Sequence, residues 1–126
     1  MKYAFENLEV WQKSRHLVKS VYLLTSSFPE EEKFGLTSQM RRASISISSN
    51  IAEGSTRWSR KDQARFYEIA FGSLIEVLNQ SILSHDLNFL PENSLKDIRA
   101  EIDTISRMLN SLYQSTQKPI SPSTKK

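Results

Sequence analysis

Cysteine is absent from the 126-residue sequence, so disulfide bonds, thiolate zinc sites and cysteine nucleophiles are excluded. Glycine and proline are scarce, with 3 and 4 residues, and a turn-rich β-sandwich is therefore not expected. No apolar run is long enough to cross a membrane, and the first residues lack the apolar core of a secretory signal. We therefore expect a cytoplasmic protein with no membrane partner.

The remaining composition is that of an ordinary globular domain. Hydrophobic residues make up 38% of the sequence and charged residues 25%, and the length suits one domain. The formal net charge is +3 and the isoelectric point is near 9.3. This basic excess is compatible with a nucleic-acid partner but is too mild to indicate one by itself.

Hydrophobic periodicity predicts four helices and no strands. Their approximate bounds are residues 7–27, 34–53, 59–86 and 91–115. The connections are short, about 5 to 8 residues, which favours antiparallel neighbours. We therefore expect an all-α, up-down-up-down four-helix bundle over residues 1–117. Residues 118–126 contain two prolines and no periodicity, and we expect a disordered basic tail there.

Several residues fit the predicted helix ends. Ser59, with Asp62 three residues later, is typical of a helix start. Gly54 fits a left-handed exit from the second helix, and Pro91 fits the first position of the fourth.

The apolar residues of the helices cover different widths. The fourth helix has a narrow seam, formed by Leu95, Ile98, Ile102, Ile105, Leu109 and Leu112. The third helix has a main stripe, formed by Phe66, Ile69, Ala70, Leu74 and Val77. Further apolar residues widen the arc to roughly 240° at 100° per residue, namely Phe71, Ile75, Leu78 and Ile82. The second helix carries Ile45 and Ala52 among serines behind its own stripe.

This width predicts self-association through the second and third helices. A fourth helix with one seam cannot cover all of the apolar surface in a monomer, and large exposed patches usually mark partner sites. Burial stabilises by about 25 cal/mol for each Å² of apolar surface. The alternative is that the third helix is the most buried element of a monomer.

Residue patterns for catalysis and metal binding are weak. His16 and His85 lie on different predicted helices and no Glu-x-x-His pair occurs, so no metal site is expected. The glycines are isolated, which excludes a phosphate-binding glycine loop. Arg42, Ser46 and Glu53 share a helical stripe with Ser49, and a structural polar network or ion pair explains them. An enzyme would need a pocket around Arg42, Asn50 and Glu53, so we expect no catalytic residues and no cofactor.

Basic residues concentrate in the middle of the chain. Between Arg41 and Arg65 there are six basic and two acidic residues, a local charge of +4. Five side chains at the predicted turn between the second and third helices form what we call the basic rim: Arg57, Trp58, Arg60, Lys61 and Arg65. Cations interleaved with an aromatic ring can bind phosphates and stack a base. The alternative is a solvated loop with no ligand.

The middle of the chain also resembles a known family. Residues 34–54, FGLTSQMRRASISISSNIAEG, are followed by Ser-x-x-Asp-x-x-Arg-Phe from residue 59 and by Ile-Ala-x-Gly-Ser-Leu-x-Glu from residue 69. The opening Phe-Glu-Asn-Leu-x-Val-Trp-x-Lys from residue 5 and the later Arg107-Met-Leu also fit. Together these segments resemble the bacterial four helix bundle proteins, found as reading frames in intervening sequences of large-subunit ribosomal RNA genes.

The resemblance implies a homopentameric ring of four-helix protomers with no established activity. It also implies a relation to the accessory variability protein of diversity-generating retroelements, which binds nucleic acid and a reverse transcriptase. The family's signature positions correspond to Arg41, Arg42, Asn50, Glu53 and Gly54, with structural or assembly roles. At residue 48 this chain has serine where many relatives have proline, so the proline kink is not expected.

Together these observations predict a non-catalytic, oligomeric scaffold that contacts RNA or DNA phosphates through the basic rim. Its assembly would use the apolar residues of the second and third helices, Ile45, Ala52, Phe71, Ile75 and Leu78. The alternative is a protein-interaction scaffold with no nucleic-acid role. In that case an acidic protein, or a protein such as a reverse transcriptase, would dock on the assembly.

Overall fold

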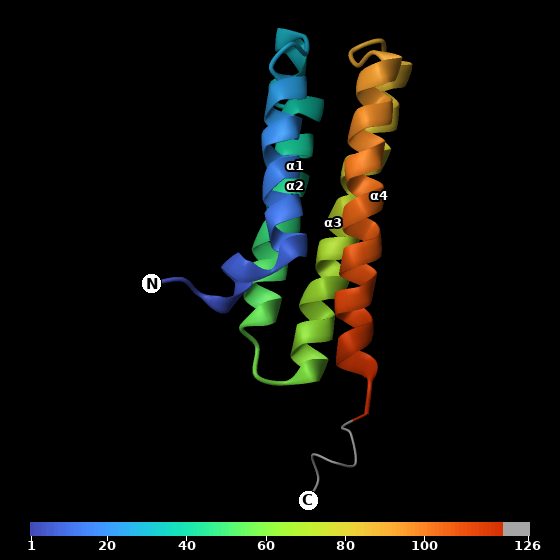
Figure 1. The fold of residues 1–126 in the computed structure, drawn as a ribbon. Coiled ribbons are helices and arrows are strands. Elements are labelled where there is room, and N and C mark those ends of the chain that lie inside the picture. Colours follow the sequence, from blue (N-terminus) through green and yellow to red (C-terminus); the bar gives the residue numbers. More distant parts are fainter. Residues whose placement is uncertain (120–126) are drawn as a thin grey trace, which may run out of the picture.

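Four long helices form the protein in a computed structural model that describes residues 1–119 (Figure 1). They are α1 (Glu9–Thr25), α2 (Leu36–Ser55), α3 (Arg60–Asp86) and α4 (Glu92–Gln117). Two short 3-10 helices precede α1 and α2, namely η1 (Ala4–Asn7) and η2 (Glu30–Glu32). The described residues contain no strand, which confirms the all-α prediction. All but two residues of the predicted tail, 118–126, lie outside the described part.

The helices run up, down, up and down, as the sequence predicts (Figure 1). Each helix packs against its neighbours in the chain, α1 also packs against α4, and the diagonal pairs do not meet. The most extensive packing joins α2 to α3. As a result, the α2–α3 turn lies at the same end as the C-terminus of α4, and the two other turns lie at the opposite end.

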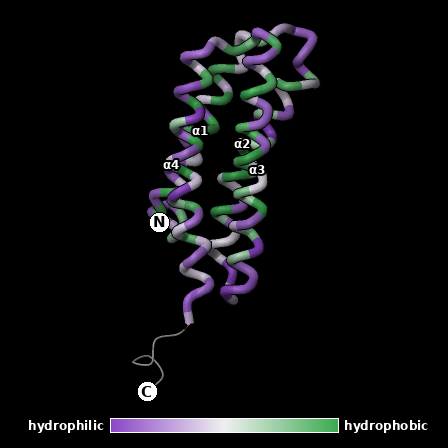
Figure 2. Tube along the Cα trace, turned by 90° about the vertical axis from the view of Figure 1, so that its right-hand side faces the viewer, coloured by the Kyte–Doolittle hydropathy of each residue, from purple (hydrophilic) through white to green (hydrophobic). Residues whose placement is uncertain are grey.

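One apolar core runs through the bundle. Polar and apolar stretches alternate along each helix (Figure 2), which is the pattern of helices that bury one face. In α4 the predicted seam is confirmed: Ile98, Ile102, Ile105 and Leu109 are buried, and the flanking leucines pack against the core.

None of the helices in residues 1–119 has the length and hydropathy needed to span a membrane.

The start of α3 is confirmed, whereas the predicted end of α2 is wrong. Ser59 caps α3, and its hydroxyl accepts a hydrogen bond from the Asp62 backbone N–H at 3.1 Å. Gly54 does not leave the helix, because α2 continues to Ser55 and no glycine has a positive φ among the described residues. Pro91 is the residue before α4 rather than its first helical residue.

Gly54 instead allows α2 and α3 to approach each other. A Cβ atom at Gly54 would lie 2.7 Å from Tyr67 Cε1 and 2.9 Å from Phe66 Cβ. Both distances are shorter than a carbon–carbon contact allows. The glycine is therefore needed for helix packing rather than for a helix exit.

The buried face of α3 differs from the predicted stripe. Ala70, Leu74 and Val77 are buried as predicted, but Ile69 is 46% exposed and Tyr67 takes a core position instead. The wide apolar arc is partly in contact with solvent, since Phe71 is 40% and Ile75 45% exposed. The other residues of that arc, Leu78 and Ile82, are half-buried, and Leu78 packs against the core. The monomer therefore leaves apolar surface of α3 uncovered.

Candidate functional site

The α2–α3 turn brings the five residues of the basic rim together at one end of the bundle. All five are exposed, and the Trp58 side chain is fully so. They lie in the last residues before α3 and in its first two turns, so the helix fixes their spacing. Gln63 closes the turn by donating a hydrogen bond to the Arg57 carbonyl at 3.0 Å. The predicted grouping of these side chains is therefore present.

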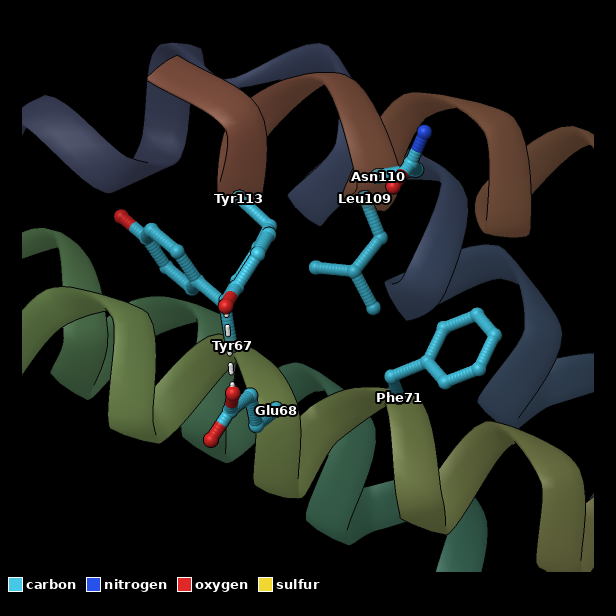
Figure 3. A pocket seen from close by; sticks show the side chains of 6 residues that line it. All are labelled: Tyr67, Glu68, Phe71, Leu109, Asn110 and Tyr113. Atoms are coloured by element: carbon cyan, nitrogen blue, oxygen red, sulfur yellow. Dashed lines mark hydrogen bonds between the residues drawn. The ribbon is translucent and has the colours of Figure 1, made fainter. Parts of the chain in front are cut away.

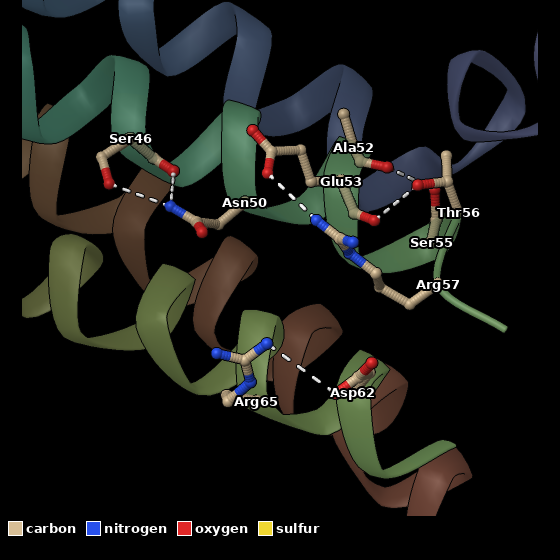
Figure 4. A network of polar contacts seen from close by, with 9 residues as sticks. All are labelled: Ser46, Asn50, Ala52, Glu53, Ser55, Thr56, Arg57, Asp62 and Arg65. Carbon is tan, nitrogen blue, oxygen red and sulfur yellow. Dashed lines mark hydrogen bonds and ion pairs between the residues drawn. The ribbon is translucent and has the colours of Figure 1, made fainter. Parts of the chain in front are cut away.

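Two rim arginines lie close to the same aromatic ring. The Arg57 guanidinium carbon is 4.4 Å and that of Arg65 is 5.2 Å from the centroid of the Phe66 ring. Each arginine also has a carboxylate nearby: Arg57 is 3.7 Å from Glu53, and Arg65 is 3.7 Å from Asp62 (Figure 4). Exposed pairs at this distance contribute little to stability.

The remaining rim cations are less engaged with acids. Arg60 donates a hydrogen bond to the Lys118 carbonyl, which joins α3 to the end of α4. Lys61 lines a shallow hollow of about 500 Å³ between α3 and the end of α4, together with Arg65. Neither Arg60 nor Lys61 forms an ion pair within residues 1–119.

The expected polar stripe on α2 is divided between two places. Asn50 donates a hydrogen bond to the Ser46 carbonyl at 2.8 Å (Figure 4). The Ser46 hydroxyl also forms a hydrogen bond with the hydroxyl of Ser73 on α3 at 2.8 Å. Glu53 pairs with Arg57 and not with Arg42. The stripe therefore contains both a hydroxyl network, which links α2 to α3, and a separate ion pair at Glu53. Arg42 lines the depression beside α1, whereas Asn50 bonds Ser46 and Glu53 pairs with Arg57.

Arg41 and Arg42 lie on the side of α2 that faces α1. The Arg41 Nε donates a hydrogen bond to Thr25 Oγ1 at 2.9 Å, and its guanidinium carbon lies 4.4 Å from the Tyr22 ring centroid. Both arginines line a depression that also includes Lys33 and Phe34. Tyr22, Lys33 and Phe34 are not among the site residues predicted from the sequence. In the sequence, only their aromatic or basic character indicates that they could form a site. The residues through which α1 meets α2 are far apart in the chain, so their proximity is visible only in the structure.

Exposed apolar residues form two separate faces. On α2, Ile45 borders the depression beside α1, and Ala52 is half-buried further along the helix. On α3, Phe71 lines a hollow of about 230 Å³ against Leu109 and Tyr113 of α4 (Figure 3). The two faces therefore lie on opposite flanks of the α2–α3 pair.

A tyrosine and a carboxylate meet in the hollow between α3 and α4. The Tyr113 hydroxyl donates a hydrogen bond to Glu68 Oε2 at 3.2 Å (Figure 3). This hydrogen bond raises the pKa of Tyr113, because the neutral phenol is the donor and its anion would face a carboxylate. Burial raises the pKa of Tyr67 on the same wall. Both phenols are therefore neutral at pH 7, and the hydroxyl of Tyr113 is already engaged with the Glu68 carboxylate.

The histidines lie apart from each other and each lies near one acid. His16 Nε2 is 4.0 Å from Glu101, and His85 Nε2 is 3.4 Å from Glu92. Among residues 1–119, no group of three potential metal ligands occurs.

Comparison with known proteins adds family and fold information. The model of the 23S rRNA-intervening sequence protein family matches residues 6–111. The fold is similar to the crystal structure of a protein of unknown function from the S23 ribosomal protein family of Bacteroides thetaiotaomicron. The TM-score is 0.74 at 22% sequence identity, over 82% of this chain and 97% of that one. No curated protein has a matching sequence.

Proposed function

Because the chain belongs to the 23S rRNA-intervening sequence protein family, we propose that it is a non-catalytic scaffold that contacts RNA or DNA phosphates. The observation that carries this proposal is the basic rim, where four exposed cations and an exposed tryptophan lie at one end of the bundle. The rim binds the phosphate backbone through charge and stacks an unpaired base on Trp58. Such contacts do not read base sequence.

We further propose that the protomers assemble into a ring, as the resemblance to the pentameric family implies. The two exposed apolar faces support this geometry, because they lie on different flanks of the protomer. When a face on α2 packs against a different face on α3 of the next copy, the contact is head-to-tail. Such contacts form a ring when the rotation between successive copies closes on itself. Phe71 and Ile75 would provide the α3 face, and Ile45 and Ala52 the α2 face.

Ring assembly would give nucleic acid a high overall affinity even though the site on each protomer is weak. Each protomer contributes one copy of the rim, and the copies would act together on a long polyanion. The protein-interaction alternative has no observation in its favour over this one. The two functions are distinguished by whether the protein binds nucleic acid at all, and by whether that binding weakens as the salt concentration rises.

The test is a gel shift with mixed RNA and DNA at two salt concentrations. We expect binding that weakens steeply with salt, because phosphate contacts release counterions. Reversing Arg57, Arg60 and Lys61 together to glutamate should abolish the shift without dissociating the assembly in light scattering. The matched control reverses Lys96, Arg99 and Arg107, three exposed cations of α4. Equal binding by the two triple variants would refute the role of the rim.

The assembly is tested separately by Ile75→Glu, which places a charge on the exposed α3 face. We expect a smaller mass in light scattering with unchanged helicity. Asp103→Glu on the exposed side of α4 is the control for the substitution itself. A wild-type mass equal to one protomer at micromolar concentration would refute the ring.

A further inference from the structure

A depression on the flank between α1 and α2 collects cations without carboxylates. It is shallow, with a volume of about 490 Å³, and its lining contains three cations and no acid. The lining residues that matter here are Lys33, Phe34, Arg41 and Arg42, with Tyr22 beneath Arg41. We call this depression the flank site. It lies beside α1 and α2, whereas the basic rim lies in the α2–α3 turn and at the start of α3.

Arg41 is held in place by neutral groups only. Its Nε donates to the Thr25 hydroxyl at 2.9 Å, and that hydroxyl donates in turn to the Val21 carbonyl at 2.8 Å. The guanidinium also stacks on Tyr22. These contacts fix the side chain but use only one of its nitrogens. In the described chain, the two terminal amino groups of Arg41 have no hydrogen-bond partner.

Arg41 is half-buried as a residue, and no carboxylate of the described residues pairs with its guanidinium. Two parallel N–H groups at the end of a fixed arginine match the oxygens of a phosphate. Arg42 and Lys33 add positive charge at the same depression, and neither has an ion pair within residues 1–119. In the basic rim, by contrast, Arg57 and Arg65 each have a carboxylate at 3.7 Å.

Phe34 adds an aromatic surface beside these cations. Its side chain is 86% exposed, and the Lys33 ammonium lies 5.7 Å from its ring centroid. An exposed phenylalanine next to phosphate-binding side chains offers a face on which a base can stack. Phosphate esters that carry an unpaired base combine both features.

We propose that the flank site binds a nucleotide unit, with its phosphate on Arg41 and Arg42 and its base stacked on Phe34. The ligand chemistry is a phosphate ester bearing an unpaired base, either within a single strand or as a free nucleotide. This site goes beyond the proposed function of the basic rim and shares no residue with it, although Ile45 at its border also belongs to the α2 face of the proposed ring.

The experiment measures fluorescence anisotropy of a labelled, single-stranded oligouridylate with the full-length protein at low salt. Arg42→Glu should weaken binding about tenfold, because a phosphate contact is replaced by repulsion. Phe34→Ala should weaken it at least about fivefold through lost stacking. Arg99→Glu makes the same charge change on an exposed residue of α4 and should leave binding within about twofold.

Two further measurements identify the occupant. Adenosine monophosphate that displaces the labelled strand would assign the site to free nucleotides as well, whereas failure to compete would assign it to a strand. Light scattering of Arg42→Glu should give the wild-type mass. If the variant loses the assembly and keeps its affinity for the strand, the occupant is a second copy of the chain and the proposal is wrong.

Equal affinities of Arg42→Glu and Arg99→Glu would also overturn the flank site. A matched duplex that binds as tightly as the single strand, with no effect of Phe34→Ala, would overturn the stacking. The triple reversal of the basic rim is measured alongside. Unchanged strand binding in the rim variant would contradict only the proposed function of the rim. A failure of the rim proposal can therefore be distinguished from a failure of the flank-site proposal.

Discussion

Replacing Gly54 by alanine should destabilise the protein, although alanine favours a helix more than glycine does. In an isolated helix the change would stabilise by about 1 kcal/mol. Here the new Cβ would lie 2.7 Å from Tyr67 Cε1 and 2.9 Å from Phe66 Cβ. The Phe66 Cβ is attached directly to the α3 backbone, so it cannot retreat unless α3 moves.

Overpacking of a tight core costs about 1–3 kcal/mol, and occasionally more. After the helix-propensity gain is subtracted, we expect Gly54→Ala to lower the free energy of unfolding by up to about 2 kcal/mol. The melting temperature should then fall by several degrees. Circular dichroism during urea and thermal unfolding, at one fixed protein concentration, measures both quantities.

Gly72 provides the matched control, because it also lies inside a helix but a Cβ atom added there would have no neighbour within 4 Å. Gly72→Ala should therefore raise the free energy of unfolding by about 0.5–1 kcal/mol. A Gly54→Ala variant that is as stable as Gly72→Ala would refute the packing role of Gly54. It would restore the interpretation of this glycine as a simple helix-end signal.

Two further predictions concern single polar groups. The raised pKa of Tyr113 means that the stability from its hydrogen bond to Glu68 is complete below pH 10. That stability should be lost as the pH rises through the higher pKa of the folded state, and Tyr113→Phe should lack this part of the pH dependence in urea unfolding. Ser59→Ala should cost about 1 kcal/mol by removing the α3 cap. Ser49→Ala, on an exposed position of α2, should cost nothing measurable in the same assay.

The helices and the core seam of α4 could be predicted because periodicity is a local property of the sequence. The seam from Ile98 to Leu109 can be predicted from the sequence of α4 alone, because it is the one buried side of one helix. The role of Gly54 could not be predicted, because glycine serves both helix exits and close helix contacts, and only the position of α3 distinguishes them. The exposure of Ile69 could not be predicted either, because nothing in its spacing shows which side of α3 meets α2.

The basic rim could be found from the sequence because its residues are consecutive around one turn. The flank site could not, since Tyr22, Lys33 and Arg41 come from different elements and meet only when α1 packs against α2. The uncompensated state of Arg41 is likewise a tertiary property. Adjacent arginines in a helix indicate nothing about which of them reaches a carboxylate.

The two positively charged surfaces lie at different heights along the bundle, which makes their cooperation testable. At 1.5 Å per residue, Arg41 is about 21 Å along the α2 axis from Ser55, the last helical residue before the turn that leads to the basic rim. A single strand of a few nucleotides can span that distance. If one strand touches both surfaces, its second contact is intramolecular, and the two sites reinforce each other. In that case, Arg42→Glu combined with the triple reversal of the rim should weaken the binding of a long strand by less than the product of the separate effects. The reason is that either change alone already removes the joint binding. A strand too short to span the distance should show independent effects. Independent effects for strands of both lengths would show that the surfaces bind separate ligands.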